Sequence, residues 1–473
     1  MNHPLLSGHL KPVLNQRDPQ AYTLLTGATG LVGQFLLKEL LLAGVRVAVL
    51  VRGSKRQSPR DRIETIMQRW ERELRINLPR PIVIHGEVSM PELGMSTEDQ
   101  GWVASHCESV IHNAAVVSFE EMDRTKEPWT TNVQGTKNVV AFLDKHGIQE
   151  LHYVSTAFVC GNRQGIIRES ELECGQVFRN PYEESKFLAE KFVREQSTKI
   201  RTTIYRPSII AGDSVTGFAS SYHGLMLYLR LLDLLVPQQL KNADGQYETP
   251  IELPIRGDEP HDIVTVNFVA RAIASLFCNP ASHGDTYHLC ADEPTTFRYV
   301  IDCCCRFFNS GGVTYNSERT AIEPTSQFAQ LFLEQSRVYQ DYNRCETRFD
   351  MRNFRRFFPD FRSAPIDEKM IQRYLEFGRL DRWGKRRPAR PEMPAEVDSF
   401  LKDFIVSQLH QLEDSKSTMI GVELLGPGGG QWTAVIADGE IQDWRTGIST
   451  SVVELFRLND LNEAIRRPTS FAK

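Results

Sequence analysis

The sequence has no apolar run that is long and unbroken enough to cross a membrane. Its two longest apolar stretches, residues 36–51 and 225–236, are interrupted by charged side chains such as Arg46 and Arg230. A membrane-spanning helix needs about 20 predominantly apolar residues, so neither stretch qualifies. Residues 1–18 also lack the apolar core of a secretory signal. We therefore expect no transmembrane segment and a cytoplasmic protein.

The sequence also lacks paired cysteines and an excess of basic charge. It contains nine cysteines, and no two of them form a C-x-x-C pair. Cys303, Cys304 and Cys305 stand together among apolar neighbours, which favours small core residues of a helix over metal ligands. This cysteine usage suits a reducing compartment, and we expect no metal site. The formal net charge of −5 gives no reason to expect a nucleic acid as a partner.

The first half of the chain alternates short apolar runs with helical patterns. Strands that are apolar throughout and alternate with helices are typical of a parallel sheet covered on both faces. The predicted fold class is therefore α/β, with a doubly wound parallel sheet of the Rossmann kind. The expected strands are residues 22–26, 45–51, 81–85, 109–112, 151–155 and 202–205, and the clearest helices are residues 31–43 and 132–146.

A chain of 473 residues is too long for one ordinary core, which predicts more than one domain. After residue 211 the alternation weakens, and we assign the following region to a second, smaller lobe. A basic stretch with three prolines at residues 385–395 predicts a linker. The expected division is an N-terminal extension (1–20), a doubly wound domain (21–300), the rest of a smaller lobe (301–384), a linker (385–397) and a small α+β module (398–473).

A glycine-rich turn stands between the first expected strand and the first expected helix. Residues 22–33 run YTLLTGATGLVG, so Gly27, Gly30 and Gly33 fall in the pattern T-G-x-x-G-x-x-G. Glycines there let the backbone approach a pyrophosphate, and the N–H groups that begin the helix point at the anion. The second strand ends at Arg52, where a site for NAD usually has an acidic residue. A cation there pairs with a 2′-phosphate, which favours NADP (NADPH) as the cofactor.

Tyr182 and Lys186 are four residues apart in NPYEESKFLAEK, so on a helix they share a face. A phenol with a pKa near 10 is a poor acid–base group at neutral pH. A neighbouring ammonium is expected to lower that pKa, and Lys186 can also hold the nicotinamide ribose. An ordinary surface pair would show the same spacing. A hydroxyl-bearing strand end precedes them, where either Ser155 or Thr156 could donate to the substrate oxygen.

Together these motifs resemble those of the extended short-chain dehydrogenase/reductase superfamily. H-N-A-A at residues 112–115, N-V-x-G-T at 132–136 and S-T-A-x-V-x-G at 155–161 complete the pattern in that family's order, over roughly residues 20–300. The resemblance implies that Thr156 is the catalytic hydroxyl, Tyr182 the acid and Lys186 its partner. It also implies an adenine contact at Glu87, where an Asp is more usual. The implied cofactor-binding residues are Gly27, Thr29, Gly30, Leu31, Val32, Gly33, Arg52, Ala114, Ala115, Asn132, Ser155, Lys186, Pro207 and Ser208.

Within that superfamily, RPSIIAGDSVTG at residues 206–217 and GEVSMPELG at 86–94 resemble segments of thioester reductase domains and fatty acyl-CoA reductases. In these enzymes a helical lid follows, where this chain has residues 224–240. The resemblance implies reduction of an acyl thioester, carried by coenzyme A or a carrier protein, to an aldehyde or alcohol. Three alternatives remain: a dehydrogenase of a hydroxysteroid-like or other alcohol or carbonyl, a sugar-nucleotide epimerase or dehydratase, and a non-catalytic NADP-binding scaffold.

The C-terminal tail carries a second resemblance. GVELLGPGGGQW at residues 421–432, with 433–439 and 458–465, is similar to a short sterol-carrier-like module, which implies lipid binding. A tight glycine turn in a small sheet explains the same residues equally well. The sequence does not indicate an oligomeric state.

Overall fold

The structure, a computed structural model, describes residues 14–318, 326–344, 346–386, 418–437 and 440–460, with a few single residues between these ranges. Its largest element is a seven-stranded sheet with the order β12-β7-β5-β4-β1-β2-β3. Every neighbouring pair in it is parallel. The strands are β1 (Tyr22–Thr26), β2 (Arg46–Val51), β3 (Ile82–His85), β4 (Cys107–His112), β5 (Glu150–Val154), β7 (Arg201–Pro207) and β12 (Thr286–Leu289). The predicted fold class is confirmed.

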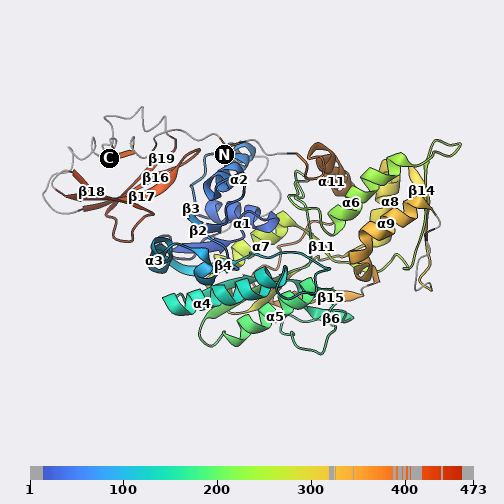
Figure 1. Cartoon of the computed structure of the whole chain (residues 1–473), viewed down its shortest axis with the longest axis horizontal. Coiled ribbons are helices and arrows are strands. Elements are labelled where there is room, and N and C mark those ends of the chain that lie inside the picture. The colour runs from blue at the N-terminus through green and yellow to red at the C-terminus, as the bar shows by residue number, and fades with distance from the viewer. Residues whose placement is uncertain are drawn as a thin grey trace.

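Helices cover both faces of this sheet (Figure 1). On one face lie α1 (Leu31–Leu42), α2 (Pro59–Leu74) and α7 (Val266–Phe277), whose apolar sides share one core with the sheet. On the other face α3 (Thr97–His106), α4 (Thr136–His146) and α5 (Pro181–Glu195) bury a second core. Burial of two faces explains why the strands are apolar throughout. The expected helix at 132–146 begins instead with a π-helical turn, Thr130–Gly135, before α4.

The second lobe accounts for the weaker alternation after residue 211. The chain leaves the sheet after β7 and returns to it through α7 and β12, which the sequence pattern did not reveal. The lobe is built around α6 (Leu225–Leu235), α8 (Phe297–Phe308), α9 (Gln327–Ser336), the 3-10 helix η7 (Arg337–Arg344) and α11 (Glu368–Leu380), with β9 (Tyr247–Leu253) parallel to β14 (Ser310–Tyr315). Cys303 and Cys304 are buried in its core on α8, as predicted, whereas Cys305 is half-buried against the same core.

Short paired strands and turns connect the lobe to the sheet. They are β8 (Ile209–Ala211) with β11 (Ile263–Thr265), β6 (Gly165–Ile167) with β15 (Thr347–Phe349), and β10 (Pro260–His261) with β13 (Thr295–Thr296). The helix α10 (Arg352–Phe357) follows β15. No helix among the described residues is both long and apolar enough to span a bilayer.

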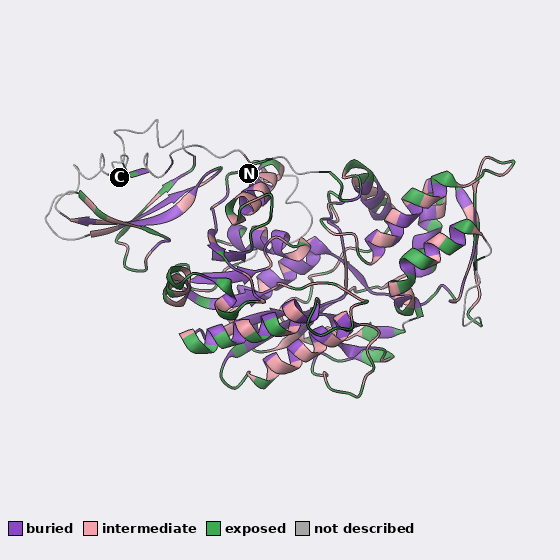
Figure 2. Ribbon diagram, viewed as in Figure 1, coloured by how far each residue is buried: buried purple, intermediate pink, exposed green. Residues whose placement is uncertain are grey.

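The C-terminal module is a four-stranded sheet of order β18-β17-β16-β19. Its strands are β16 (Thr418–Leu424), β17 (Gly430–Ala437), β18 (Glu440–Thr446) and β19 (Glu454–Leu458). The segment GPGGG forms the turn between antiparallel β16 and β17. Figure 2 shows buried residues along these strands. Most of the linker lies outside the described residues, as do most of residues 398–417 and all of residues 461–473 and 1–13.

The module contacts the large sheet at the amino-terminal ends of its strands. Trp102, on the helix before β4, donates to the Thr446 carbonyl at 2.8 Å. The hydroxyl of Tyr22, the first residue of β1, accepts from the Ile448 amide at 3.0 Å. Ligand sites of doubly wound sheets lie at the opposite, carboxyl edge of the strands. The module therefore stands across the sheet from the site described next.

Candidate active site

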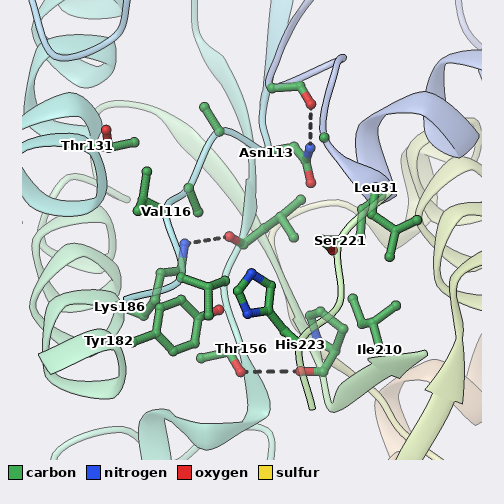
Figure 3. A pocket seen from close by; sticks show the side chains of 18 of the residues that line it. Leu31, Asn113, Val116, Thr131, Thr156, Tyr182, Lys186, Ile210, Ser221 and His223 are labelled. Carbon is green, nitrogen blue, oxygen red and sulfur yellow. Dashed lines mark hydrogen bonds between the residues drawn. The ribbon is translucent and has the colours of Figure 1, made fainter. Parts of the chain in front are cut away.

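A cavity of about 560 Å³ lies at the carboxyl ends of the strands, where the strand order reverses between β1 and β4 (Figure 3). This switch point is where doubly wound sheets bind nucleotides. Of the residues expected to form the site, the cavity is lined by Gly27, Thr29, Gly30, Leu31, Val32, Arg52, Ala114, Ala115, Ser155, Thr156, Tyr182, Lys186, Pro207 and Ser208. Gly33 and Asn132 are buried behind this wall and shape it.

The glycine-rich loop requires glycine at two positions because backbone atoms of other residues lie where a side chain would stand. A Cβ at Gly27, where φ is +71°, would lie 2.7 Å from the amide nitrogen of Ala114. A Cβ at Gly33 would lie 2.0 Å from the carbonyl oxygen of Gly27. The helix α1 begins after Gly30 without a side chain hydrogen-bonded to its first turn. Its first amides thus remain available to a phosphate group, so this cradle fits the pyrophosphate of a dinucleotide.

The loop after β4 is held in place from behind. The side chain of Asn132 accepts from the amide of Val116 at 2.8 Å and donates to the carbonyl of the same residue at 3.0 Å. Its amide group also donates to Ser185 Oγ at 2.9 Å, which links this loop to α5. The hydroxyl of Thr26 accepts from the amide of Ala114 at 3.1 Å. Asn132 therefore positions the cavity wall through the backbone.

Thr156, Tyr182 and Lys186 meet at one end of the cavity. Thr156 is the second residue after the end of β5, whereas Tyr182 and Lys186 share one face of α5. The side chain of Asn180 caps that helix by accepting from the Glu183 amide at 3.0 Å. Figure 3 shows Tyr182 and Thr156 directed into the same space. Lys186 is buried and donates to the Val154 carbonyl at 2.8 Å.

Burial sets the protonation of these groups. It raises the pKa of the Tyr182 phenol to about 12, and a hydrogen bond with Thr156 only partly opposes this rise. Burial lowers the pKa of Lys186 to about 7, against the attraction of Glu190. The pKa of Tyr182 is therefore shifted in the direction opposite to the one expected from a neighbouring ammonium, because desolvation of the phenolate outweighs the other influences. At neutral pH the Tyr182 phenol is protonated.

The hydroxyl of Ser155 is directed away from the substrate side. It donates to Glu190 Oε2 at 2.7 Å, and Glu190 forms a fully buried ion pair with Arg206 at 2.6 Å. The Arg206 side chain also donates to the carbonyl of Glu171 at 2.8 Å. This network holds the end of β5 against α5 and β7. Of the two hydroxyls that the sequence left open, the structure therefore places that of Thr156 beside Tyr182.

A second arginine, which no sequence motif identified, joins Arg52 at the other end of the cavity. Arg62 on α2 lines the cavity, donates to the Arg52 carbonyl at 2.8 Å and contacts Thr29 Oγ1 at 3.0 Å. The side chain of Arg52 is exposed and pairs with Glu87 at 3.1 Å. Burial, followed by the charge of Arg52, lowers the pKa of Arg62. The nine residues between the two arginines include the start of α2, so no local motif linked them.

Aromatic side chains that no motif identified form the wall beyond Tyr182. Phe119 lies edge-on to Tyr182 at 5.9 Å between ring centroids and to Tyr339 at 5.0 Å. Tyr339 and Tyr342 come from η7 of the second lobe, and Tyr339 Oη lies 3.3 Å from His223 Nδ1. All five residues line the cavity. The only hint in the sequence is their aromatic character.

Comparison with known proteins agrees with a dinucleotide-binding fold. The family model described as "Male sterility protein", an NAD-binding domain, matches residues 25–273. One component of the linear gramicidin synthase of Brevibacillus parabrevis is 28% identical over 60% of this chain and 5% of its own length. Fatty acyl-CoA reductase 1 of Mus musculus is 27% identical over 42% of this chain and 46% of its own length. The chain thus matches less than half the length of these curated relatives.

A solved structure extends the match beyond the dinucleotide-binding part. The terminal R domain from the myxalamid PKS-NRPS biosynthetic pathway is 25% identical, with a TM-score of 0.61, over 80% of this chain and 95% of that domain. The R domain of a nonribosomal peptide synthetase from Mycobacterium tuberculosis shares the fold, with a TM-score of 0.54 at 20% identity. The chain belongs to the male sterility family of NAD-binding domains, and it is similar to reductase domains of peptide synthetases and to a fatty acyl-CoA reductase.

Proposed function

We propose that this chain uses NADPH to reduce an acyl thioester to an aldehyde or an alcohol. The observation that carries the proposal is that one cavity contains three features in turn. These are the glycine-rich loop, the pair Thr156 and Tyr182, and the aromatic wall. Such a wall suits the apolar part of an acyl group. The relatives named as fatty acyl-CoA reductases and as an NRPS-like oxidoreductase support the same reaction class.

The roles of the side chains follow from their positions. When bound, NADPH supplies the hydride. Thr156 and Tyr182 would both donate hydrogen bonds to the thioester carbonyl oxygen, where negative charge develops. Because the phenol of Tyr182 is protonated at neutral pH, it can transfer its proton to that oxygen. Lys186, held by the Val154 carbonyl, would add positive charge beside the phenol. The carbonyl would re-form when the carbon–sulfur bond breaks: the new hydroxyl returns its proton to the Tyr182 phenolate, and the departing thiolate takes a proton from water.

A preference for NADPH over NADH is part of the proposal. Arg52 and Arg62 meet where the second strand ends, at the place of the 2′-phosphate in this fold. Two guanidinium groups there would form charge-assisted hydrogen bonds to that phosphate. Glu87, which pairs with Arg52, would orient the Arg52 side chain. Replacing Arg62 with Gln should raise the KM for NADPH by about tenfold or more, and leave the KM for NADH nearly unchanged. Equal effects on both cofactors would contradict this assignment.

The reaction itself is tested by single-turnover oxidation of NADPH with three substrates in parallel: an acyl-CoA, a free aldehyde and a sugar nucleotide. We expect loss of NADPH absorbance with the acyl-CoA, and mass spectrometry should detect the aldehyde or alcohol. Turnover of the sugar nucleotide alone would favour the epimerase or dehydratase alternative. Binding of NADPH without turnover of any substrate would favour a scaffold. Tyr182→Phe is the control for catalysis by this cavity.

Two further assignments stay predictions. All eight cysteines among the described residues are free thiols, which supports a cytoplasmic location.

Lipid binding by the C-terminal module would act at a distance from the cavity, because the module contacts the sheet at the amino-terminal ends of its strands. Deleting the residues after Pro388 should weaken activity on long acyl chains more than on short ones if the module binds lipid. Equal loss on both would indicate a structural role.

A further inference from the structure

His223 lines the cavity, and neither the catalytic group nor the cofactor site includes it. It lies two residues before α6, at the point where the chain enters the second lobe. The residue is exposed, and Figure 3 shows its imidazole directed into the cavity, on the side of Tyr182 and Thr156. His223 is therefore accessible to a molecule that binds in the cavity.

Contacts through Tyr339 place His223 at the reacting end of the cavity. His223 Nδ1 lies 3.3 Å from Tyr339 Oη. Besides burial, which has the larger effect, Tyr339 contributes electrostatically to the raised pKa of Tyr182, so the two phenols lie close together. Phe119 packs edge-on against both of these tyrosine rings. His223 therefore shares with Tyr182 the end of the cavity where the carbonyl group would react.

The backbone around His223 is held in one conformation. Gly224 has a φ of +54°, in the region that favours glycine, and a Cβ there would lie 2.9 Å from Cγ2 of Ile209. The His223 carbonyl accepts from the amide of Met226 at 3.1 Å, in the first turn of α6. The imidazole is thus held through its backbone by α6 and at Nδ1 by Tyr339.

Hydrogen bonds determine which ring nitrogen of His223 carries the proton. Desolvation lowers the pKa of the imidazole, so the ring is neutral at neutral pH and has one N–H group. Burial raises the pKa of Tyr339 to about 12, and the hydroxyl of Tyr339 accepts from the Gly224 amide. Among the described residues, the acceptor for the hydroxyl proton of Tyr339 is His223 Nδ1. The ring proton therefore belongs on Nε2, which has no hydrogen-bond partner in the described part of the chain.

A donor at this end of the cavity suits the sulfur of a thioester. In the proposed reaction Thr156 and Tyr182 bind the carbonyl oxygen, and the aromatic wall takes the acyl chain. The sulfur is the substituent of the reacting carbon that these groups leave without a partner. A thioester sulfur is a weak acceptor, whereas a thiolate accepts strong, charge-assisted hydrogen bonds. A donor beside the sulfur therefore stabilises the transition state of carbon–sulfur cleavage more than it stabilises the bound substrate.

We propose that His223 is a catalytic residue that donates a hydrogen bond from Nε2 to the sulfur as the carbon–sulfur bond breaks; this inference rests on the proposed function. NADPH has by then been oxidised, and its hydride is on the acyl carbon. The hydroxyl of the intermediate returns its proton to the Tyr182 phenolate, the carbonyl re-forms, and the electron pair of the carbon–sulfur bond moves to the sulfur. His223 keeps its own proton and stabilises the thiolate until the thiolate takes a proton from water.

The test follows hydride transfer and thiol release separately in a single turnover of an acyl-CoA. Stopped-flow absorbance of NADPH reports hydride transfer, and a chromogenic disulfide reports the free thiol, with an enzyme blank for the protein's own cysteines. The variant His223→Leu removes the donor. The matched control is His223→Gln, because the side-chain amide of glutamine also donates and lies at a similar distance from the backbone. Circular dichroism and a fluorescence titration of NADPH check that both variants fold and bind the cofactor.

If His223 stabilises the thiolate, His223→Leu slows thiol release by about 10–100-fold, which is the usual worth of a hydrogen bond to a charged group. Its NADPH oxidation stays within about twofold of the wild type, so the thiol signal lags behind, and His223→Gln largely restores the release rate. Thiol release that keeps pace with NADPH oxidation in His223→Leu overturns the proposal, whether both rates are unchanged or both fall equally. Failure of the proposed function is separately visible, because the wild type then oxidises no NADPH with the acyl-CoA.

The defect should also depend on the leaving thiol. A thiol of lower pKa leaves more readily, so its thiolate needs less stabilisation. With the same acyl group on thiophenol, a stronger acid than the thiol of coenzyme A, we expect His223→Leu to slow release by about threefold or less. Equal defects with both thioesters overturn the proposal. Tyr339→Phe removes the hydroxyl that directs the ring proton to Nε2, and it should give a smaller lag than His223→Leu.

Discussion

Replacing Gly33 with Ala tests why glycine is required at this position. The close approach of the Gly27 backbone, rather than helix propensity, is the expected reason. The added Cβ would lie 2.0 Å from the Gly27 carbonyl oxygen and 2.8 Å from Ala28 Cα, both backbone atoms that cannot rotate away. Gly101, inside α3, has open space where a Cβ would stand. In a helix interior Ala is favoured over Gly by about 1 kcal/mol. Overpacking typically costs about 1–3 kcal/mol, and a contact this short belongs at the upper end.

We therefore expect Gly33→Ala to lower the free energy of unfolding by about 2 kcal/mol and Gly101→Ala to raise it by about 0.5–1 kcal/mol. The measurement is urea unfolding followed by circular dichroism. Because the clash displaces the first turn of α1 from the pyrophosphate position, Gly33→Ala should also weaken NADPH binding by about tenfold or more in a fluorescence titration. Equal stability of the two variants, with unchanged NADPH affinity, would refute the argument from backbone contact.

Three further predictions address the chemistry and the buried network. Tyr182→Phe should lower kcat by about 10²–10⁴-fold while NADPH affinity in a fluorescence titration changes little, and near-normal turnover would remove Tyr182 from the mechanism. Glu190→Gln should lower the free energy of unfolding in urea by about 3–5 kcal/mol, because it leaves Arg206 buried without its partner. The matched change Glu173→Gln, in an exposed pair with Lys191, should cost less than about 1 kcal/mol. Because burial holds the pKa of Lys186 at about 7, loss of its proton should lower the reduction rate as pH rises through 7, and Lys186→Arg should abolish that inflection in the pH–rate profile; an inflection retained in Lys186→Arg belongs to another group.

Local pattern determined much of the fold and the core of the site. The strand, glycine turn and helix at residues 22–42 follow from neighbouring residues alone, because apolar periodicity and glycine conformation act over one or two turns of chain. The spacing of Tyr182 and Lys186 likewise indicated a shared helix face, and the helix α5 provides it. The order of the motifs indicated the family, which the comparisons show.

Only the tertiary structure showed which of these side chains lie in contact. Thr156 and Ser155 are adjacent in sequence, and only the buried Glu190–Arg206 pair shows which hydroxyl is engaged elsewhere. Burial reversed the expected direction of the pKa of Tyr182, because a desolvation penalty depends on everything packed around a group. The aromatic wall joins Phe119 to Tyr339 and Tyr342 of the second lobe, and Arg62 on α2 reaches Thr29 after β1. No local pattern encodes such neighbours, since their proximity exists only once the sheet and the second lobe have closed around the cavity.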